Sequence, residues 1–536
     1  MEKDLNDFIN KLEARQIPLS IESAKAEYQA SISGKEEDYK KSSDLAFEYE
    51  KIFSSKSDFA SLKKIKESGA VKDELLRRQM DLIYNMYLGN QVDEAKLQAL
   101  IEEQTKIENR FATYRVEING KKLSDNQVDS ILKNSRNSEE VKKVWLASKK
   151  IGEEVASDVI RLVKLRNEVA HKLGFKNYYE MSLRLGDQEP EDIEKLFDDL
   201  DKLTAKAFAE VKDEMDTYLA HRFGISKDEL MPWHYQNRFF QEAPKIYNVD
   251  LDGFYSKVDI LKVTENFYKG IGLPIDEVVK RSDLYEKPGK NQHAFCSDID
   301  RCGDSRVLAN ARNDEYWMNT LLHEFGHSVY DINNDRNLPF NLREAAHTFT
   351  TEGIANFFGR QASDPQWIKD NLGISDAEMI NIAGESRKNL RLSQLVFSRW
   401  SQVMFHFEKG MYENPDQDLN ALWWKMVEKY QLLKKPEGRN EPDWASKIHI
   451  ATVPCYYHNY LISELFASQI YYYIGNHVLK VSNLDDLSLS NHPEVGKYLT
   501  DKIFKPGSRY YWNEMIKRAT GEKLNPKYYV RQFVGK

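Results

Sequence analysis

Apolar residues recur at helical spacing along most of the first 235 residues, and charged residues occupy the opposite faces. This pattern is typical of amphipathic helices that bury one face. Long helices are predicted over residues 36–54, 73–89, 92–117, 138–171 and 190–223. Breaks are expected at residues 31–34, at Asn119-Gly120 and just before Pro190, where residues that favour turns interrupt the pattern. The sequence therefore predicts a mainly α fold.

Strand signals are few, and the clearest pair comprises residues 292–297 and 306–311. A glycine-containing turn separates the two segments, which predicts a short β-hairpin. The exposed edge of a hairpin offers backbone N–H and C=O groups to an extended peptide.

Residues 314–329 form a further predicted helix, which Asn313 or Asp314 can cap. It contains the run His323-Glu324-Phe325-Gly326-His327, which has the form HExxH. Residues four apart share one helix face, so both imidazoles can bind one zinc ion, and Glu324 can act as a general base. On the motif alone, a buried amphipathic helix with two ordinary histidines is the alternative.

A second ligand-bearing helix is expected beside the first. Gly326 costs about 1 kcal/mol inside a helix relative to alanine, which suggests that another segment packs closely against it. A catalytic zinc ion needs a third protein ligand. Residues 350–358 read as a helix with threonine caps, and Glu352 near its start is the best candidate. We therefore expect one zinc ion per chain, bound by His323, His327 and Glu352.

The segment 338–352, LPFNLREAAHTFTTE, resembles the corresponding segment of the angiotensin-converting enzyme (peptidyl-dipeptidase A) family. The HEFGH form is similar, more distantly, to the thimet oligopeptidase and oligoendopeptidase group. The resemblance runs from about Val258 to Gln469. It implies a two-lobed helical ellipsoid with a deep central channel and a short β-hairpin beside the zinc site. It also implies that residues 1–120 form a helical lid and residues 121–536 the catalytic region.

The resemblance assigns roles to residues outside the zinc site. His293 would bond a substrate carbonyl, and Ala294 and Cys296 would pair with the substrate backbone. Tyr460 would donate a hydrogen bond to the oxyanion, with help from His449.

The terminal carboxylate of the substrate would be held by Lys447 and Tyr457, with Tyr456 as the rival of Tyr457. The family pairs its lysine with a glutamine two residues after a tryptophan. The nearest candidate is Gln236, which follows Trp233 by three residues.

Further roles in the resemblance are supporting ones. Arg343 and Glu344 would brace the loop before Glu352 or line the primed side of the site. The segment 166–171 resembles a helix of the same superfamily, and its His171 is expected to be structural.

Two departures from the family pattern affect the expected chemistry. Asn356 replaces an aspartate that supports a zinc histidine, and a neutral amide orients an imidazole less strongly than a carboxylate. Animal members of the family hold chloride on two arginines, and these positions are Val427 and Asn459 here. Because neither side chain is charged, we expect activity to depend little on chloride.

Composition excludes several other classes of protein. The 536 residues carry a net charge of −8 without basic clusters, which argues against a nucleic-acid partner. The sequence contains no run of about 18 apolar residues, so no membrane span is predicted. The first residues resemble neither a signal peptide nor a transit sequence, so a cytoplasmic location and a secreted or periplasmic one, with the leader removed, both stay open. Cys296 and Cys302 could pair, but three reduced thiols are favoured over a disulfide.

Together these features predict zinc-dependent hydrolysis of short peptides, with release of dipeptides from the C-terminus. The alternatives are an oligoendopeptidase or a carboxypeptidase acting on short peptides. A more remote alternative is a non-catalytic helical binding protein on the same scaffold.

Overall fold

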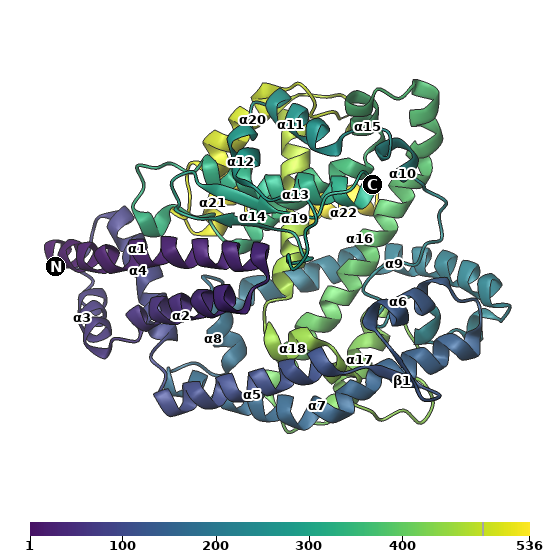
Figure 1. The fold of residues 1–536 in the computed structure, drawn as a ribbon, viewed down its shortest axis with the longest axis horizontal. Helices are drawn as coiled ribbons and strands as arrows, with labels where there is room; N and C mark the ends of the chain where they lie inside the picture. The colour runs from purple at the N-terminus through teal and green to yellow at the C-terminus, as the bar shows by residue number, and fades with distance from the viewer. Residues whose placement is uncertain (485–486, 536) are drawn as a thin grey trace. The chain divides into compact units, whose positions relative to one another are not determined.

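The computed structural model describes residues 1–484 and 487–535, which are mainly helical with two small antiparallel sheets (Figure 1). The chain divides into two compact units. Unit 1 comprises Met1–Gln91, Val249–Arg387 and Ile462–Tyr529, and unit 2 comprises Val92–Asn248, Lys388–Leu461 and Val530–Lys536. The predicted division at residue 120 into a lid and a catalytic region stays a prediction.

Unit 1 contains the N-terminal helices, the central hairpin and most of the C-terminal helices. Its elements are α1 (Glu2–Ser33), α2 (Glu36–Phe53), α3 (Lys56–Glu67), α4 (Glu74–Gly89), α10 (Asp252–Tyr255), α11 (Ile260–Gly270), α12 (Asp276–Arg281), β3 (Phe295–Asp298), β4 (Ser305–Leu308), α13 (Glu315–Ile332), α14 (Thr348–Gly359), α15 (Pro365–Leu372), α20 (Pro493–Leu499) and α21 (Trp512–Thr520).

Unit 2 is built around two long helices, α7 and α9. Its elements are α5 (Glu94–Thr113), β1 (Val116–Ile118), β2 (Lys121–Leu123), α6 (Asp125–Asn134), α7 (Ser138–Lys172), α8 (Tyr178–Leu185), α9 (Pro190–Phe223), α17 (Leu419–Met426) and α18 (Ile448–Thr452). Three further helices contain residues of both units: α16 (Asp376–Glu413), α19 (His458–Tyr473) and α22 (Lys527–Phe533).

The five helices predicted from periodicity are confirmed as α2, α4, α5, α7 and α9, with ends that differ by at most four residues. Local capping explains why they begin where they do. Asp73 accepts a hydrogen bond from the backbone N–H of Leu76 at the start of α4, and Pro190 occupies the first turn of α9.

The predicted break at Asn119-Gly120 is the turn of a hairpin that the sequence analysis missed. Strands β1 and β2 pair antiparallel, with Ile118 opposite Lys121, so the turn has two residues. Asn119 and Gly120 both have positive φ angles, 51° and 76°. Asn-Gly suits such a turn because both residues tolerate the left-handed conformation. The strands are too short for periodicity to reveal them.

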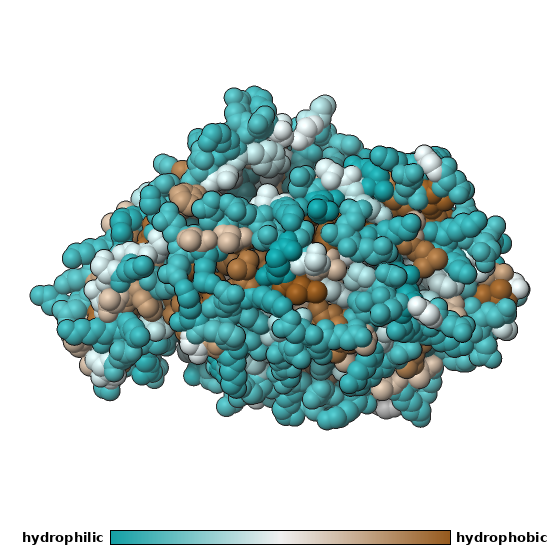
Figure 2. All heavy atoms as spheres, turned by 90° about the horizontal axis from the view of Figure 1, so that it is seen from below, coloured by the Kyte–Doolittle hydropathy of each residue, from teal (hydrophilic) through white to brown (hydrophobic). Residues whose placement is uncertain are grey.

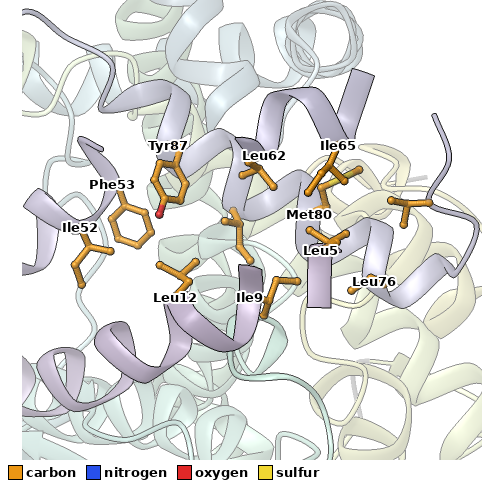
Figure 3. Close-up of a cluster of buried hydrophobic side chains, with 12 residues drawn as sticks. Leu5, Ile9, Leu12, Ile52, Phe53, Leu62, Ile65, Leu76, Met80 and Tyr87 are labelled. Carbon is orange, nitrogen blue, oxygen red and sulfur yellow. The ribbon is translucent and has the colours of Figure 1, made fainter. Parts of the chain in front are cut away.

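The first four helices of unit 1 enclose a hydrophobic core of their own. Residues Leu5, Ile9 and Leu12 of α1 follow one another at helical spacing and are almost completely buried. They pack with buried side chains of α2, α3 and α4, including Ile52, Phe53, Leu62, Ile65, Met80 and Tyr87 (Figure 3). Burial of one apolar stripe from each helix explains the periodic pattern that predicted them.

Helices α13 and α14 approach each other at a glycine. A Cβ atom added at Gly326 of α13 would lie 2.9 Å from the Cα atom of Ala355 in α14. The close approach expected from Gly326 is therefore present, and the partner is the helix that carries Glu352. Figure 1 shows the two helices side by side in unit 1.

Gly326→Ala is expected to lower the free energy of unfolding by about 1–3 kcal/mol, the usual cost of overpacking. The new methyl group would meet backbone, which cannot move aside as a flexible side chain can. Gly384→Ala in α16 is the matched control, because nothing lies within 4 Å of the added Cβ there. That control should stabilise the protein slightly through helix propensity. Denaturant unfolding of both variants tests the pair, and equal effects would contradict the packing argument.

The molecular surface seen in Figure 2 is predominantly hydrophilic, in keeping with a chain in which 30% of residues are charged. Across the described part of the chain, none of the helices combines the length and apolar character that a membrane crossing requires.

Candidate functional site

Helix α13 presents both histidines of the HExxH motif. It begins after Asp314, whose side chain accepts a hydrogen bond from the backbone N–H of Trp317 at 2.8 Å, as the sequence predicted. The apolar residues of the helix, including Leu321, Leu322 and Phe325, are fully buried. This burial fixes the rotation of the helix. The Nε2 atoms of His323 and His327 then lie 3.3 Å apart.

Glu352 reaches the same point from α14. Its Oε1 atom lies 3.6 Å from Nε2 of His323, and its Oε2 atom lies 3.5 Å from Nε2 of His327. The predicted threonine capping is confirmed in part: the N-cap residue is His347, and the Thr350 hydroxyl completes the capping box by accepting the backbone N–H of His347. His347 has an extended backbone and caps α14 by accepting the N–H of Phe349, while the Thr350 hydroxyl donates to the carbonyl of His347.

These three residues have the spacing that zinc requires. Tetrahedral zinc with bonds of about 2.0–2.1 Å separates neighbouring ligand atoms by roughly 3.3 Å. The observed separations of 3.3, 3.5 and 3.6 Å fit this geometry. Within the described residues, His323, His327 and Glu352 are the group identified as able to hold a metal ion.

Each histidine has a partner for its second ring nitrogen. Nδ1 of His327 lies 2.8 Å from the Thr351 hydroxyl, so a proton on Nδ1 leaves Nε2 free to bind metal. His323 is hydrogen-bonded to Asn356, whose Nδ2 donates to the Ser463 hydroxyl at 3.1 Å. The amide oxygen of Asn356 thus remains available to His323. Sequence reasoning identified Asn356 but missed Thr351, which only its position before Glu352 could have suggested.

Asn356→Asp is expected to raise the affinity for zinc by about tenfold, since a carboxylate makes the bonded imidazole a stronger ligand. The Ser463 hydroxyl can donate to the new carboxylate and keep it in place. Competition with a coloured chelator measures the affinity directly. Asn371→Asp, at an amide that bonds Ser490 and the Trp367 carbonyl, is the control and should leave zinc affinity unchanged. Equal or weaker binding in Asn356→Asp would contradict the role of Asn356.

The carboxylates of the site differ in acidity. Burial raises the pKa of Glu324 to about 7, although a hydrogen bond from the Cys296 backbone N–H opposes this shift. Burial also acts to raise the pKa of Glu352, but the hydrogen bond from His327 and the charges of both histidines lower it to about 2. Burial lowers the pKa of His323. Glu324 is therefore the group that can take up and release a proton near neutral pH.

The predicted hairpin is confirmed, with shorter strands than expected. Strands β3 and β4 pair antiparallel, with Phe295 opposite Leu308, and β4 also bridges to Asp283 on its other side. His293 and Ala294 come directly before β3, and His293 is exposed. The hairpin is next to α13 in unit 1, because the backbone of Cys296 in β3 donates to Glu324.

The thiol of Cys296 points into the protein. Its Sγ atom lies 3.3 Å from the Ser305 hydroxyl and 3.2 Å from the Ser328 hydroxyl, and burial raises its pKa. All three cysteines are free thiols, so Cys296 and Cys302 do not pair.

Arg343 and Glu344 contact neighbouring segments before α14, and their role in bracing the loop or lining the primed side stays a prediction. Arg343 donates to the Leu338 carbonyl at 2.6 Å and to the Cys302 sulfur at 3.1 Å. Glu344 forms a salt bridge with Arg301. His171 contacts the Lys176 carbonyl at 2.7 Å and is not part of the metal group, while its structural role stays a prediction.

The second group of predicted site residues lies in unit 2. The ring of Tyr457 is 5.6 Å from that of His449 and 5.2 Å from that of Tyr460, measured between centroids. The Tyr457 hydroxyl accepts a hydrogen bond from the Trp400 indole at 2.7 Å. Burial, and then the charge of Lys447, lower the pKa of His449 to about 4, so its ring is neutral at pH 7.

Lys447 contacts a glutamine, but not the predicted one. Its ammonium donates to Oε1 of Gln241 at 2.7 Å and lies 5.6 Å from the centre of the Tyr457 ring. Gln236 instead accepts the backbone N–H of Lys245. Gln241 is therefore the glutamine that contacts Lys447, and the substrate-binding roles of Lys447, Tyr457 and Gln236 stay predictions. Burial lowers the pKa of Lys447 to about 8.

The two chloride positions differ in their surroundings. Val427 lines a small cavity together with Lys149, Arg238 and Asp443, and the expected independence of chloride stays a prediction. Lys149 precedes Val427 by 278 residues in sequence, so no local pattern relates the two. At the second position, the Asn459 amide oxygen accepts from Gln188 at 2.8 Å.

Comparison with known proteins extends the resemblance to nearly the whole chain. The family model described as angiotensin-converting enzyme matches residues 1–527. The angiotensin-converting enzyme of Mesocricetus auratus is 24% identical over 73% of this chain, and that of Rattus norvegicus is 24% identical over 75%. The aligned part spans about a third of each of these relatives, 32% and 33%. The enzyme of Theromyzon tessulatum is 21% identical over 85% of this chain and 79% of its own length. The chain belongs to the angiotensin-converting enzyme family of peptidases.

Proposed function

We propose that this chain is a zinc-dependent peptidase that hydrolyses short peptides and releases dipeptides from the C-terminus. The observation that carries the proposal is the convergence of His323, His327 and Glu352, with atoms 3.3–3.6 Å apart, beside Glu324 on the same helix. The family to which the chain belongs supports the same conclusion.

The chemistry requires a base and a metal. When bound by the three side chains, zinc supplies a Lewis acid that polarises the scissile carbonyl and acidifies water. Glu324 accepts the proton of the attacking water and passes it to the leaving amine. The Cys296 N–H holds the Glu324 carboxylate in one orientation, and burial keeps its pKa near 7.

Tyr460 and His449 stabilise the oxyanion in this proposal. Nδ1 of His449 is a buried nitrogen for which no partner is found among the described residues, so it is available to substrate. Helix α19 carries Tyr460 and, three residues later, Ser463, which bonds the zinc-supporting Asn356. The proximity of Tyr460 to Ser463 in sequence supports its role in the reaction.

The substrate is held at two further places. His293 and Ala294, at the entry to strand β3, bind its backbone together with Cys296. Lys447, Gln241 and Tyr457 bind its terminal carboxylate. Lys447 suits this role because its hydrogen-bond partner Gln241 is neutral, so its charge is not consumed by an acidic side chain at hydrogen-bonding distance.

Two peptides of one sequence, a free acid and a C-terminal amide, test the proposal. Mass spectrometry should detect dipeptide release from the free acid, poor cleavage of the amide and no cleavage with a chelator. Lys447→Met should raise KM for the free acid by at least about tenfold, because a charge-assisted hydrogen bond is lost. Lys434→Met, at a lysine paired with Asp228, should leave KM unchanged.

Other products would redirect the proposal. Equal internal cleavage of both peptides would indicate an oligoendopeptidase. Release of single residues would indicate a carboxypeptidase. No cleavage of any peptide in the presence of zinc would refute the proposal.

A further inference from the structure

The turn between α18 and α19 contains a strained residue. Cys455 has a φ angle of 54°, in the left-handed region. This conformation costs a residue other than glycine about 1–2 kcal/mol. Helix α18 carries His449, and α19 begins three residues after Cys455 and carries Tyr460. The direction in which α19 starts therefore depends on the backbone at Cys455.

Glu408 of α16 holds this residue in place. Its Oε1 atom accepts the backbone N–H of Cys455 at 2.9 Å. Glu408 is only 2% exposed, and burial raises the pKa of its carboxyl to about 8. A buried carboxyl is costly unless it is hydrogen-bonded. The hydrogen bond between Glu408 and the strained residue suggests that the role of Glu408 is to hold the turn.

Arg166 of α7 holds the other side of the turn. Its guanidinium donates to the Ala451 carbonyl in α18 at 2.6 Å and to the Tyr412 hydroxyl at 3.2 Å. Two buried side chains from different helices thus hold this stretch of backbone. Arg166 donates to the carbonyl of Ala451, and Glu408 accepts the N–H of Cys455. Tyr457 has a separate anchor in Trp400, and Lys447 in Gln241.

We propose that Glu408 is a positioning residue that fixes the turn at Cys455 and thereby orients Tyr460 for the reaction. The inference rests on the proposed function, in which Tyr460 contacts the oxyanion. Because Tyr457 and Lys447 are held independently, loss of Glu408 lowers kcat and leaves KM nearly unchanged.

The test compares Glu408→Met with Glu408→Gln. Methionine has similar length but no acceptor, so kcat should fall about 10- to 100-fold, as for small misplacements of a reacting group. Glutamine keeps an acceptor oxygen and should stay within about twofold of wild type. Glu413→Met, on the same helix at an exposed position, is the control and should change nothing. Equal losses in the methionine and glutamine variants would overturn the proposal.

Two further variants separate positioning from general loss of stability. Cys455→Gly should restore most of the kcat lost in Glu408→Met, because glycine adopts a positive φ without support. In a Tyr460→Phe background, Glu408→Met should cause little additional loss, since Glu408 acts through Tyr460. Full additivity of the two losses, or no rescue by glycine, would contradict the inference.

Hydrogen exchange gives a readout that does not need activity. Amides of residues 453–461 should exchange faster in Glu408→Met but not in Glu408→Gln or Glu413→Met. Unchanged exchange in Glu408→Met would refute the anchor itself. If Tyr460→Phe alone left kcat unchanged, the proposed role of Tyr460 would fail, and the positioning proposal with it, even where exchange shows that Glu408 holds the turn.

Discussion

Replacing Glu324 by glutamine is expected to lower kcat by about 10²- to 10⁴-fold, the usual contribution of a general base. An amide cannot accept the proton of the attacking water. The fold should tolerate the change, because Glu324 is buried and glutamine can still accept the N–H of Cys296. Zinc content should also be unchanged, since none of the three ligands is altered. Steady-state kinetics and metal analysis on the same preparation measure both effects.

Glu413→Gln is the matched control, because it makes the same substitution at an exposed position and should retain full activity. Glu324→Asp gives an intermediate case, in which the carboxylate is kept but withdrawn by one methylene. It should be more active than the glutamine variant and less active than wild type. Activity of Glu324→Gln within tenfold of wild type would reject the role of Glu324 as the base.

The helical framework could be predicted because each long helix buries one stripe of apolar residues. Helices α7 and α9 each contain more than 30 residues, so the period is repeated many times and their ends carry clear caps. The zinc group was predictable for a related reason. His323 and His327 are fixed by spacing on one helix, and Gly326 indicated close packing against another.

Residues in irregular segments were harder to predict. Gln236 and Phe240 both have positive φ angles, 59° and 52°, in a segment of bends without regular secondary structure. The number of residues after Trp233 therefore does not show which glutamine lies near Lys447. Consequently the sequence indicated Gln236, whereas the glutamine that Lys447 contacts is Gln241.

Contacts between distant segments leave no periodic or local trace. Glu408 precedes Cys455 by 47 residues, and Arg166 precedes Ala451 by 285. Glu408 and Arg166 are charged residues within long helices, where an exposed side chain is the default expectation. Only the packing of α7 and α16 in unit 2 reveals that these two side chains are buried and bonded to the same turn.

Removal of a zinc ligand should have the largest effect of all. In His327→Ala we expect zinc affinity to fall by more than the roughly 10- to 100-fold that loss of an outer partner costs, because a direct bond to the metal disappears. Two protein ligands would remain where a catalytic site needs three. After dialysis the variant should contain little zinc and should show no measurable peptide hydrolysis at any substrate concentration.

His171→Ala is the control for this prediction, since His171 bonds the Lys176 carbonyl and is not part of the metal group. It should keep one zinc ion per chain and full activity, which shows that loss of a histidine as such is harmless. Adding excess zinc should not restore His327→Ala, because the remaining donors cannot enclose the ion. Wild-type zinc content in both His327→Ala and His323→Ala would mean that the metal binds elsewhere. The convergence of α13 and α14 on one point would then need another explanation, because two partly buried histidines beside a carboxylate would have no ion to hold.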